Sequence, residues 1–174
     1  TLPAPTAFLE RYAIDSGRPI VLFLARLDPK KGLEILLTAL SRLEERHPRA
    51  LLVIAGSGEP SFETALRRQA ARLGVADRII WTGFLDRSIK LSALAAASVY
   101  VLPSRSENFG MSLLEALAAG CPVVILLNTW ELLDAEARED VLFQVRERLH
   151  FMSESPVLKG SALSGKGIHK ILPE

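Results

Sequence analysis

The sequence has almost no cysteine and no long apolar run. Cys121 is the only cysteine among 174 residues, which excludes an internal disulfide and a cysteine-ligated metal cluster. We interpret Cys121 as a small buried hydrophobic residue and expect a reducing, cytoplasmic location. No apolar run approaches the ~20 residues that cross a bilayer, and no signal peptide is visible, so we expect no membrane span.

The sequence also lacks an excess of charge of either sign. It has 21 lysine and arginine residues against 20 aspartate and glutamate residues, a net charge of +1. A nucleic-acid-binding domain usually shows a basic excess, so we expect no nucleic acid partner. His47, His150 and His169 share no ligand spacing, and we predict neither a metal site nor a cofactor. The chain starts at Thr1, which we interpret as a fragment, a processed chain or an engineered one.

Short apolar runs separated by amphipathic stretches are abundant, and they predict secondary structure. Near-continuous runs such as Ile20–Leu24 are typical of parallel strands buried on both faces. The strands that we predict are Ile20–Ala25, Leu51–Ala55, Arg78–Trp81, Val99–Leu102, Pro122–Leu127 and Pro156–Lys159. The predicted helices are Pro5–Asp15, Gly32–Arg46, Phe62–Leu73, Ser88–Ala97, Phe109–Ala119 and Leu133–Leu149, with a short one after Gly165.

This alternation of strands and helices predicts a doubly wound, three-layer α/β/α Rossmann-like fold. We expect six mostly parallel strands in the order 3-2-1-4-5-6. No linker or repeat divides the chain, so we expect residues 1–174 to form one domain. Ligands of such sheets bind at the carboxyl ends of the strands, and the loops after the strands are therefore the candidate sites.

The loop after the first predicted strand carries two cations, Arg26 and Lys31, beside the start of a helix. Helix amides and cationic side chains together suit a diphosphate. A solvated turn with surface charges accounts for the same residues, and the spacing alone favours neither interpretation.

The loops after the second and third strands contain glycine. Gly56-Ser57-Gly58 lets a backbone approach a ligand, although an ordinary turn is the favoured interpretation. Gly83-Phe84-Leu85 offers main-chain groups to a base edge, on weaker grounds.

The loop after the fourth strand contains two carboxylates, Glu107 and Glu115, which suit sugar hydroxyls because carboxylates accept strong hydrogen bonds. The amides from Asn108 to Met111 suit anionic oxygens. Helix capping by Glu107 and an exposed helix face for Glu115 are the alternatives. An exposed face is less natural for Glu115, since it lies within the apolar run Leu113–Leu117.

Several of these motifs, in this order, resemble one family. Arg26 followed by Lys31 and Gly32 is similar to the R-x-x-x-x-K-G motif of retaining GT-B glycosyltransferases of family 4, the glycosyl transferase group 1. The stretch from Glu107 to Glu115 is similar to that family's E-x-x-x-x-x-x-x-E motif. The resemblance covers residues 1–124, and spaced motifs in order are more specific than any one motif.

The resemblance implies roles for these residues in a donor-binding domain. Arg26 and Lys31 would bind the diphosphate of a nucleotide-sugar, Glu107 the donor sugar and Glu115 the ribose. The Leu85 backbone would lie near the base. The sugar-phosphate pocket would be lined by Asn108, Phe109, Gly110 and Met111.

Residues 125–174 resemble a different family, the Der/EngA-type GTPases. Asn128-Thr129-Trp130-Glu131 is similar to the N-K-x-D guanine motif, and Ser161-Ala162-Leu163 to the S-A-L guanine loop. The lysine and the aspartate of that motif are replaced here, and no G-x-x-x-x-G-K-S/T phosphate loop precedes it. We therefore expect no GTP hydrolysis, only degenerate remnants of a guanine site, and a segment that completes the sheet.

These two resemblances favour an engineered or recombined chimera without catalytic activity that retains weak nucleotide or nucleotide-sugar binding. A scaffold without any activity is a second hypothesis. The third is a fragment of a functional glycosyltransferase. Transfer would require an acceptor domain, since GT-B chemistry takes place in a cleft between two domains. We expect this acceptor domain to be missing.

Overall fold

The computed structural model describes residues 4–43, 46–104, 111–121, 125–127, 130–148 and 156–159. The chain divides into two compact units, Thr1–Pro122 and Val123–Glu174. The division lies within two residues of position 124, where the sequence changes from one resemblance to the other. The single domain over residues 1–174 stays a prediction, and each unit is described by itself.

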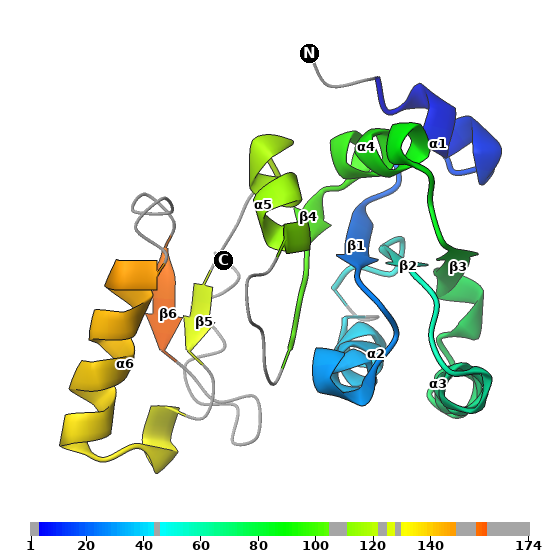
Figure 1. The fold of residues 1–174 in the computed structure, drawn as a ribbon. Helices are drawn as coiled ribbons and strands as arrows, with labels where there is room; N and C mark the ends of the chain where they lie inside the picture. The colour runs from blue at the N-terminus through cyan, green and yellow to red at the C-terminus, as the bar shows by residue number, and fades with distance from the viewer. Residues whose placement is uncertain are drawn as a thin grey trace. The chain divides into compact units, whose positions relative to one another are not determined.

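The first unit contains a parallel four-stranded sheet. Its strands are β1 (Ile20–Leu24), β2 (Leu51–Ala55), β3 (Ile79–Gly83) and β4 (Val99–Tyr100), in the order β3-β2-β1-β4. Ile20 is in register with Leu51, and Val21 with Val99. β1 therefore lies in the middle of the sheet (Figure 1).

Helices cover both faces of this sheet. α1 (Thr6–Arg11) and α4 (Arg87–Ala96) lie on one face, and α2 (Leu33–Arg42) and α3 (Pro60–Arg72) on the other (Figure 1). α5 (Met111–Ala118) adds its buried Ala116 to the core under α1 and α4. Two short 3-10 helices, η1 (Pro29–Lys31) and η2 (Ala76–Arg78), complete the described elements of this unit.

The apolar runs arise because alternate residues of each central strand enter different cores. Leu22 and Val53 pack in the core that contains Phe8 and Leu94. Their neighbours Phe23 and Ile54 pack in the core under α2 and α3. All four strand residues are 0 % exposed, which confirms parallel strands buried on both faces.

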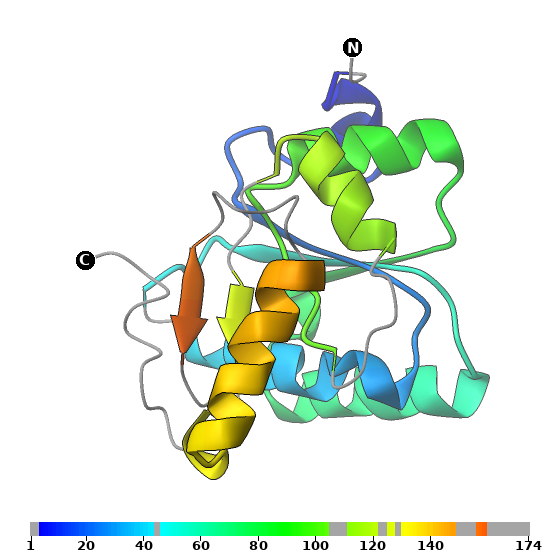
Figure 2. The ribbon, with the colours of Figure 1, turned by 60° about the vertical axis from the view of Figure 1, so that its left-hand side comes forward.

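The second unit has a parallel pair of short strands and one long helix. β5 (Ile125–Leu127) pairs with β6 (Val157–Lys159), and between them come η3 (Trp130–Leu132) and α6 (Ala135–Arg148). The Ala137 amide donates to the Asp134 carboxylate at 2.8 Å, which caps the first turn of α6. Figure 2 shows α6 together with the strand pair.

The prediction of one six-stranded sheet is wrong. Among the described residues the strands form two sheets, one of four and one of two, although the order 3-2-1-4 and the pairing of the fifth with the sixth strand agree with expectation. β4 ends at Tyr100 rather than Leu102. A two-residue strand has few ladder groups, and Pro103 has no N–H to donate, so β4 offers little to a further strand.

Two predicted helices also need comment. The first helix ends at Arg11 rather than Asp15, because Ala13 has a left-handed φ of 50°. The short helix predicted after Gly165 lies outside the described residues. No helix in the described ranges is both long enough and apolar enough to cross a membrane.

Candidate functional site

The strand order places a topological switch point between β1 and β4. The chain proceeds from β1 through β2 to β3 and then returns to the other side of β1, and ligands of doubly wound sheets bind where the order reverses in this way. The loops after β1 and β4 meet there. Gly32 has φ 70°, and a Cβ on it would overlap the Pro103 carbonyl oxygen. Only glycine fits this point.

The loop after β1 holds both predicted diphosphate ligands. Asp28 accepts a hydrogen bond from the Lys30 amide at 2.9 Å through its side chain, and its carbonyl accepts one from the Lys31 amide at 2.9 Å. These bonds form η1 and bring Lys31 to the start of α2. Arg26 is exposed and Lys31 half-buried. The structure thus places both cations in one loop at the switch point, with Lys31 in its ordered turn, and their role stays a prediction.

The glycines after β2 accommodate protein backbone. A Cβ on Gly56 would overlap the Ala25 carbonyl oxygen, and one on Gly58 the Leu27 carbonyl oxygen. The Leu27 amide donates to the Ser57 backbone carbonyl at 3.0 Å, so the two loops lie in direct contact. These contacts favour the interpretation of an ordinary turn whose glycines let the first loop approach.

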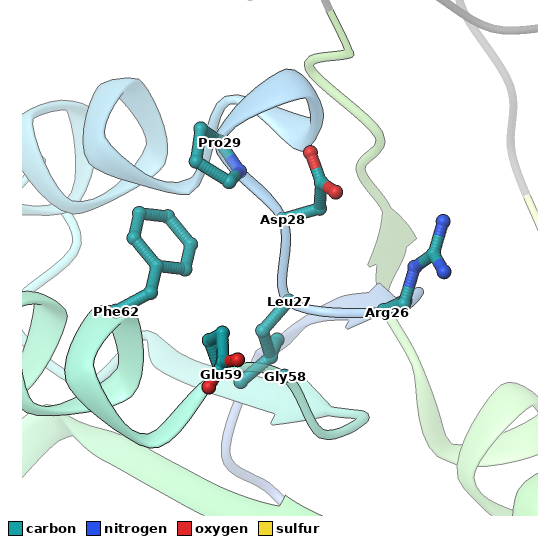
Figure 3. Close-up of a pocket in the computed structure, with 7 residues that line it drawn as sticks. All are labelled: Arg26, Leu27, Asp28, Pro29, Gly58, Glu59 and Phe62. Carbon is teal, nitrogen blue, oxygen red and sulfur yellow. The ribbon is translucent and has the colours of Figure 1, made fainter.

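A solvent-open cavity of about 420 Å³ lies between the loop after β1 and the start of α3. Figure 3 shows Phe62 and Pro29 on one side of it and the Arg26 side chain directed away from Phe62. Its lining includes Asp28 and Glu59, whose negative charges disfavour an anion. The cavity thus brings one predicted diphosphate ligand, Arg26, together with two carboxylates.

Glu115 lies on α5 in an ion pair that the sequence did not reveal. Its Oε1 is 2.5 Å from the Lys90 Nζ of α4, and the side chains of Lys90 and Glu115 are 24 % and 37 % exposed. The expectation that a solvated face is less natural for Glu115 agrees with this half-buried position. Lys90 is the functional candidate that sequence reasoning missed. The only local indication in the sequence is that Lys90 is a cation between the apolar residues Ile89 and Leu91.

A buried tyrosine holds the beginning of α5. The Tyr100 hydroxyl donates to Ser112 Oγ at 2.7 Å and lies 3.4 Å from the Leu24 carbonyl oxygen. Tyr100 is 6 % exposed and its strand is paired with β1. This link connects the end of β1 with the first turn of α5, one turn before Glu115.

The loop after β3 has a buried and an exposed hydrophobic residue. Leu85 is 6 % exposed and packs in the core, whereas Phe84 is 85 % exposed. The Gly56 amide donates to the Gly83 carbonyl at 2.8 Å, so this loop adjoins the loop after β2. A base-proximal role for the Leu85 backbone stays a prediction.

Other predicted site residues fall elsewhere. Met111 is the first residue of α5 and is 64 % exposed. Glu131 lies in η3 of the second unit. The remaining candidates lie outside the described residues: Glu107, Asn108, Phe109, Gly110, Asn128, Thr129, Ser161, Ala162 and Leu163.

Two groups of the first unit have shifted pKa values. Hydrogen bonds from the Ile89 amide and then from Ser88 lower the pKa of Asp86, the N-cap of α4, from its usual 3.8. Burial raises the pKa of the Cys121 thiol above its usual 9.0. Cys121 is 6 % exposed, as predicted for a small buried hydrophobic residue.

Within the described ranges no three His, Cys, Asp or Glu residues are grouped in a way that could hold a metal ion.

The family model of glycosyl transferases group 1 matches residues 6–128, about seven-tenths of the chain. This chain belongs to the group 1 glycosyltransferases. Among curated relatives, an uncharacterised glycosyltransferase of Methanocaldococcus jannaschii is 37 % identical over 118 residues, which cover 68 % of this chain and 30 % of the relative. A GDP-mannose-dependent α-(1-6)-phosphatidylinositol monomannoside mannosyltransferase of Mycobacterium tuberculosis is 40 % identical over 129 residues, 70 % of this chain and 33 % of the relative. The chain thus spans about a third of the length of these relatives.

Solved structures show the same fold. WaaG, a glycosyltransferase of lipopolysaccharide biosynthesis, matches with a TM-score of 0.67 and 21 % identity over 91 % of this chain and 38 % of its own. HepE of Anabaena, solved with UDP-glucose, matches with a TM-score of 0.62 and 24 % identity over 85 % of this chain and 45 % of its own. At these identities the likeness shows the GT-B domain fold alone.

The comparisons give no support to a GTPase-derived segment or to a chimera. The family model reaches residue 128, past the point where the sequence pattern changes, and the WaaG match covers 91 % of the chain. A strand, a long helix and a second strand are common to many doubly wound folds, so residues 125–174 resemble a GTPase tail without descent from one being shown. Of the hypotheses drawn from sequence, a glycosyltransferase fragment fits these findings better than a chimera.

Proposed function

We propose that this chain is the donor-binding domain of a group 1 glycosyltransferase and that it binds a nucleotide-sugar. The mycobacterial relative is named as GDP-mannose-dependent, and HepE was solved with UDP-glucose. Both donors are nucleoside diphosphate sugars, although the bases differ. The shared chemistry that we assign to this chain is therefore a diphosphate linked to a ribose and a sugar.

One observation carries the proposal: Arg26 and Lys31 lie in the same loop at the switch point of the sheet, and Lys31 closes an ordered turn there. Asp28 shapes that turn through its bonds to the Lys30 and Lys31 amides. A turn that is ordered in advance loses less conformational entropy when an anion binds. Arg26 and Lys31 would neutralise the diphosphate, and Glu115 would accept from the ribose hydroxyls. Glu107 would contact the sugar.

We further propose that the 174-residue chain binds the donor but does not transfer its sugar. Transfer needs the acceptor held against the donor and water kept out. In a GT-B enzyme those tasks fall to the cleft between two domains, and this chain spans about a third of its curated relatives. Donor binding is thus the activity to test on this chain.

Isothermal titration calorimetry with UDP-, ADP- and GDP-sugars tests the proposal and identifies the base. We expect one class to bind at micromolar concentration. Charge-assisted hydrogen bonds contribute about 1.5–3 kcal/mol each, so Arg26→Ala and Lys31→Ala should each weaken binding about tenfold or more. Arg68→Ala removes a charge from an exposed position of α3 and is the matched control, expected to leave the affinity unchanged.

The sugar-free nucleotide separates the two carboxylates. Glu107→Ala should weaken the affinity for the nucleotide-sugar only. Glu115→Ala should weaken the affinities for the nucleotide and the nucleotide-sugar alike. The proposal is wrong if all three donor classes fail to bind, or if a donor binds and Arg26→Ala, Lys31→Ala and Glu115→Ala leave its affinity unchanged.

A further inference from the structure

Lys90 and Glu115 come from different helices and meet within one ion pair. The Lys90 Nζ donates to Glu115 Oε1 at 2.5 Å across 25 residues of sequence. We propose that Lys90 is a positioning residue, which holds the Glu115 carboxylate ready for the ribose of the donor. This inference rests on the proposed function, because it assigns a partner to one of the residues of that site.

The backbones on either side of the pair are held by the core. Ala93 and Leu94, one turn after Lys90 on α4, are 0 % and 1 % exposed, and Ala116, next to Glu115, is 0 % exposed. All three belong to one core cluster. Cys121, three residues past the end of α5, lies with its Sγ 3.2 Å from the Leu94 carbonyl oxygen. The separation of Lys90 from Glu115 is thus set by packed helices rather than by two freely moving side chains.

Partial burial distinguishes this pair from the more exposed Arg49–Asp15 and Arg11–Asp86 pairs. The side chains of Lys90 and Glu115 are 24 % and 37 % exposed, against 67 % and 66 % for Arg49 and Asp15. Fully exposed pairs contribute little to stability or order because water screens them and both side chains lose freedom. A half-buried pair between two packed helices restricts the rotamers of the carboxylate more effectively.

The chemistry of a carboxylate allows it to hold the lysine and a ligand together. Each of its two oxygens accepts hydrogen bonds, so Oε1 can keep the ammonium while Oε2 accepts from ribose hydroxyls. A carboxylate that is already oriented loses less side-chain entropy when the ligand arrives. Lys90 therefore acts on the ribose through Glu115, without a contact of its own to the nucleotide.

Ribose and 2′-deoxyribose nucleotides distinguish this role from a direct contact with phosphate. The experiment measures, by calorimetry on the full chain, the affinities of UDP, ADP or GDP, whichever binds, and of its 2′-deoxy form. The variants are Lys90→Met, Lys90→Arg, Glu115→Ala and the double variant of Lys90→Met with Glu115→Ala. Arg87→Met removes a cation from an exposed position of the same helix and is the matched control.

We expect Lys90→Met to weaken the affinity for the ribonucleotide about threefold to fivefold, the size expected for a half-buried ion pair. The affinity for the deoxynucleotide should stay nearly unchanged. Lys90→Arg should restore the preference for ribose, because its guanidinium can pair with the same carboxylate. In the Glu115→Ala background, Lys90→Met should have no further effect, since coupled residues are not additive. Arg87→Met should behave as the unchanged protein.

Three outcomes overturn the inference while nucleotide binding persists. If Lys90→Met weakened the affinities for both nucleotides equally, Lys90 would contact the phosphate directly. An unchanged ribonucleotide affinity, or losses that add in the double variant, would mean that Lys90 does not act through Glu115. Failure of the unchanged protein to bind any of the three nucleotides would instead overturn the proposed function, and this inference with it. Circular dichroism of each variant confirms that it is folded.

Discussion

Replacing Gly32 by alanine probes the contact between the two loops of the switch point. Gly32 has φ 70°, and a Cβ there would overlap the backbone carbonyl oxygen of Pro103. Gly74, at the end of α3, offers a matched control, because it has φ 72° and nothing within 4 Å of an added Cβ. Both substitutions force alanine into the left-handed region, but only one meets an obstacle.

The expected magnitudes follow from this difference. A left-handed alanine costs roughly 1–2 kcal/mol, and the lower entropy of the unfolded alanine chain offsets about 0.4–1 kcal/mol of that at both positions. The obstacle at Gly32 is backbone, which cannot rotate away, and overpacking of this kind costs about 1–3 kcal/mol more. We therefore expect Gly32→Ala to destabilise the protein by at least ~1 kcal/mol more than Gly74→Ala.

Urea denaturation, followed by circular dichroism, measures both free energies of unfolding. Calorimetric titration with the donor measures whether the displaced loop still binds. Gly32→Ala should weaken nucleotide binding, since the shift of residue 32 moves the adjacent Lys31, whereas Gly74→Ala should not. Equal losses of stability for the two variants, or unchanged binding by a folded Gly32→Ala protein, would refute the assignment of this contact to the switch point.

Three further predictions concern groups in the first unit. Arg78 is 6 % exposed and donates to the Ala50 and His47 carbonyls, each at 3.2 Å. Arg78→Ala should therefore cost about 2–4 kcal/mol of unfolding free energy by urea titration, since a buried and a partly buried carbonyl both lose charged donors, and an unchanged midpoint would contradict this. The lowered pKa of Asp86 stabilises the fold above pH 3.8, and this contribution disappears as the pH falls through its folded value. Thermal melts of Asp86→Ala and the unchanged protein should thus differ near neutral pH and converge in acid. The raised pKa of Cys121 keeps its thiol protonated, so iodoacetamide should label the folded protein much more slowly than the urea-unfolded one; equal rates would show that the thiol is accessible.

Much of the first unit could be predicted from local sequence patterns. The apolar runs at Ile20–Leu24 and Leu51–Ala55 are strands with the predicted bounds or within one residue of them, because burial on both faces requires hydrophobic residues at every position. The order of the first four strands agrees with the common order of doubly wound folds. Knowing where β1 ends was enough to predict that Arg26 and Lys31 lie in the loop after it.

Other features depend on residues that are distant in sequence, and only the tertiary structure decided them. Lys90 and Glu115 are 25 residues apart, and no spacing rule connects residues on two different helices. Arg78 is buried because the turn at residues 47–50 supplies its carbonyl acceptors. The close approach of Gly32 to Pro103 depends on where two loops meet.

The division of the strands into sheets of four and two also had to come from the structure. A run of hydrophobic residues indicates that a strand is buried, but the pattern does not specify which strand lies beside it. Local periodicity thus determined the elements of this protein and the loops that carry its candidate ligands. Packing between distant elements determined how those ligands are held, because contact energies depend on neighbours in space rather than on neighbours in sequence.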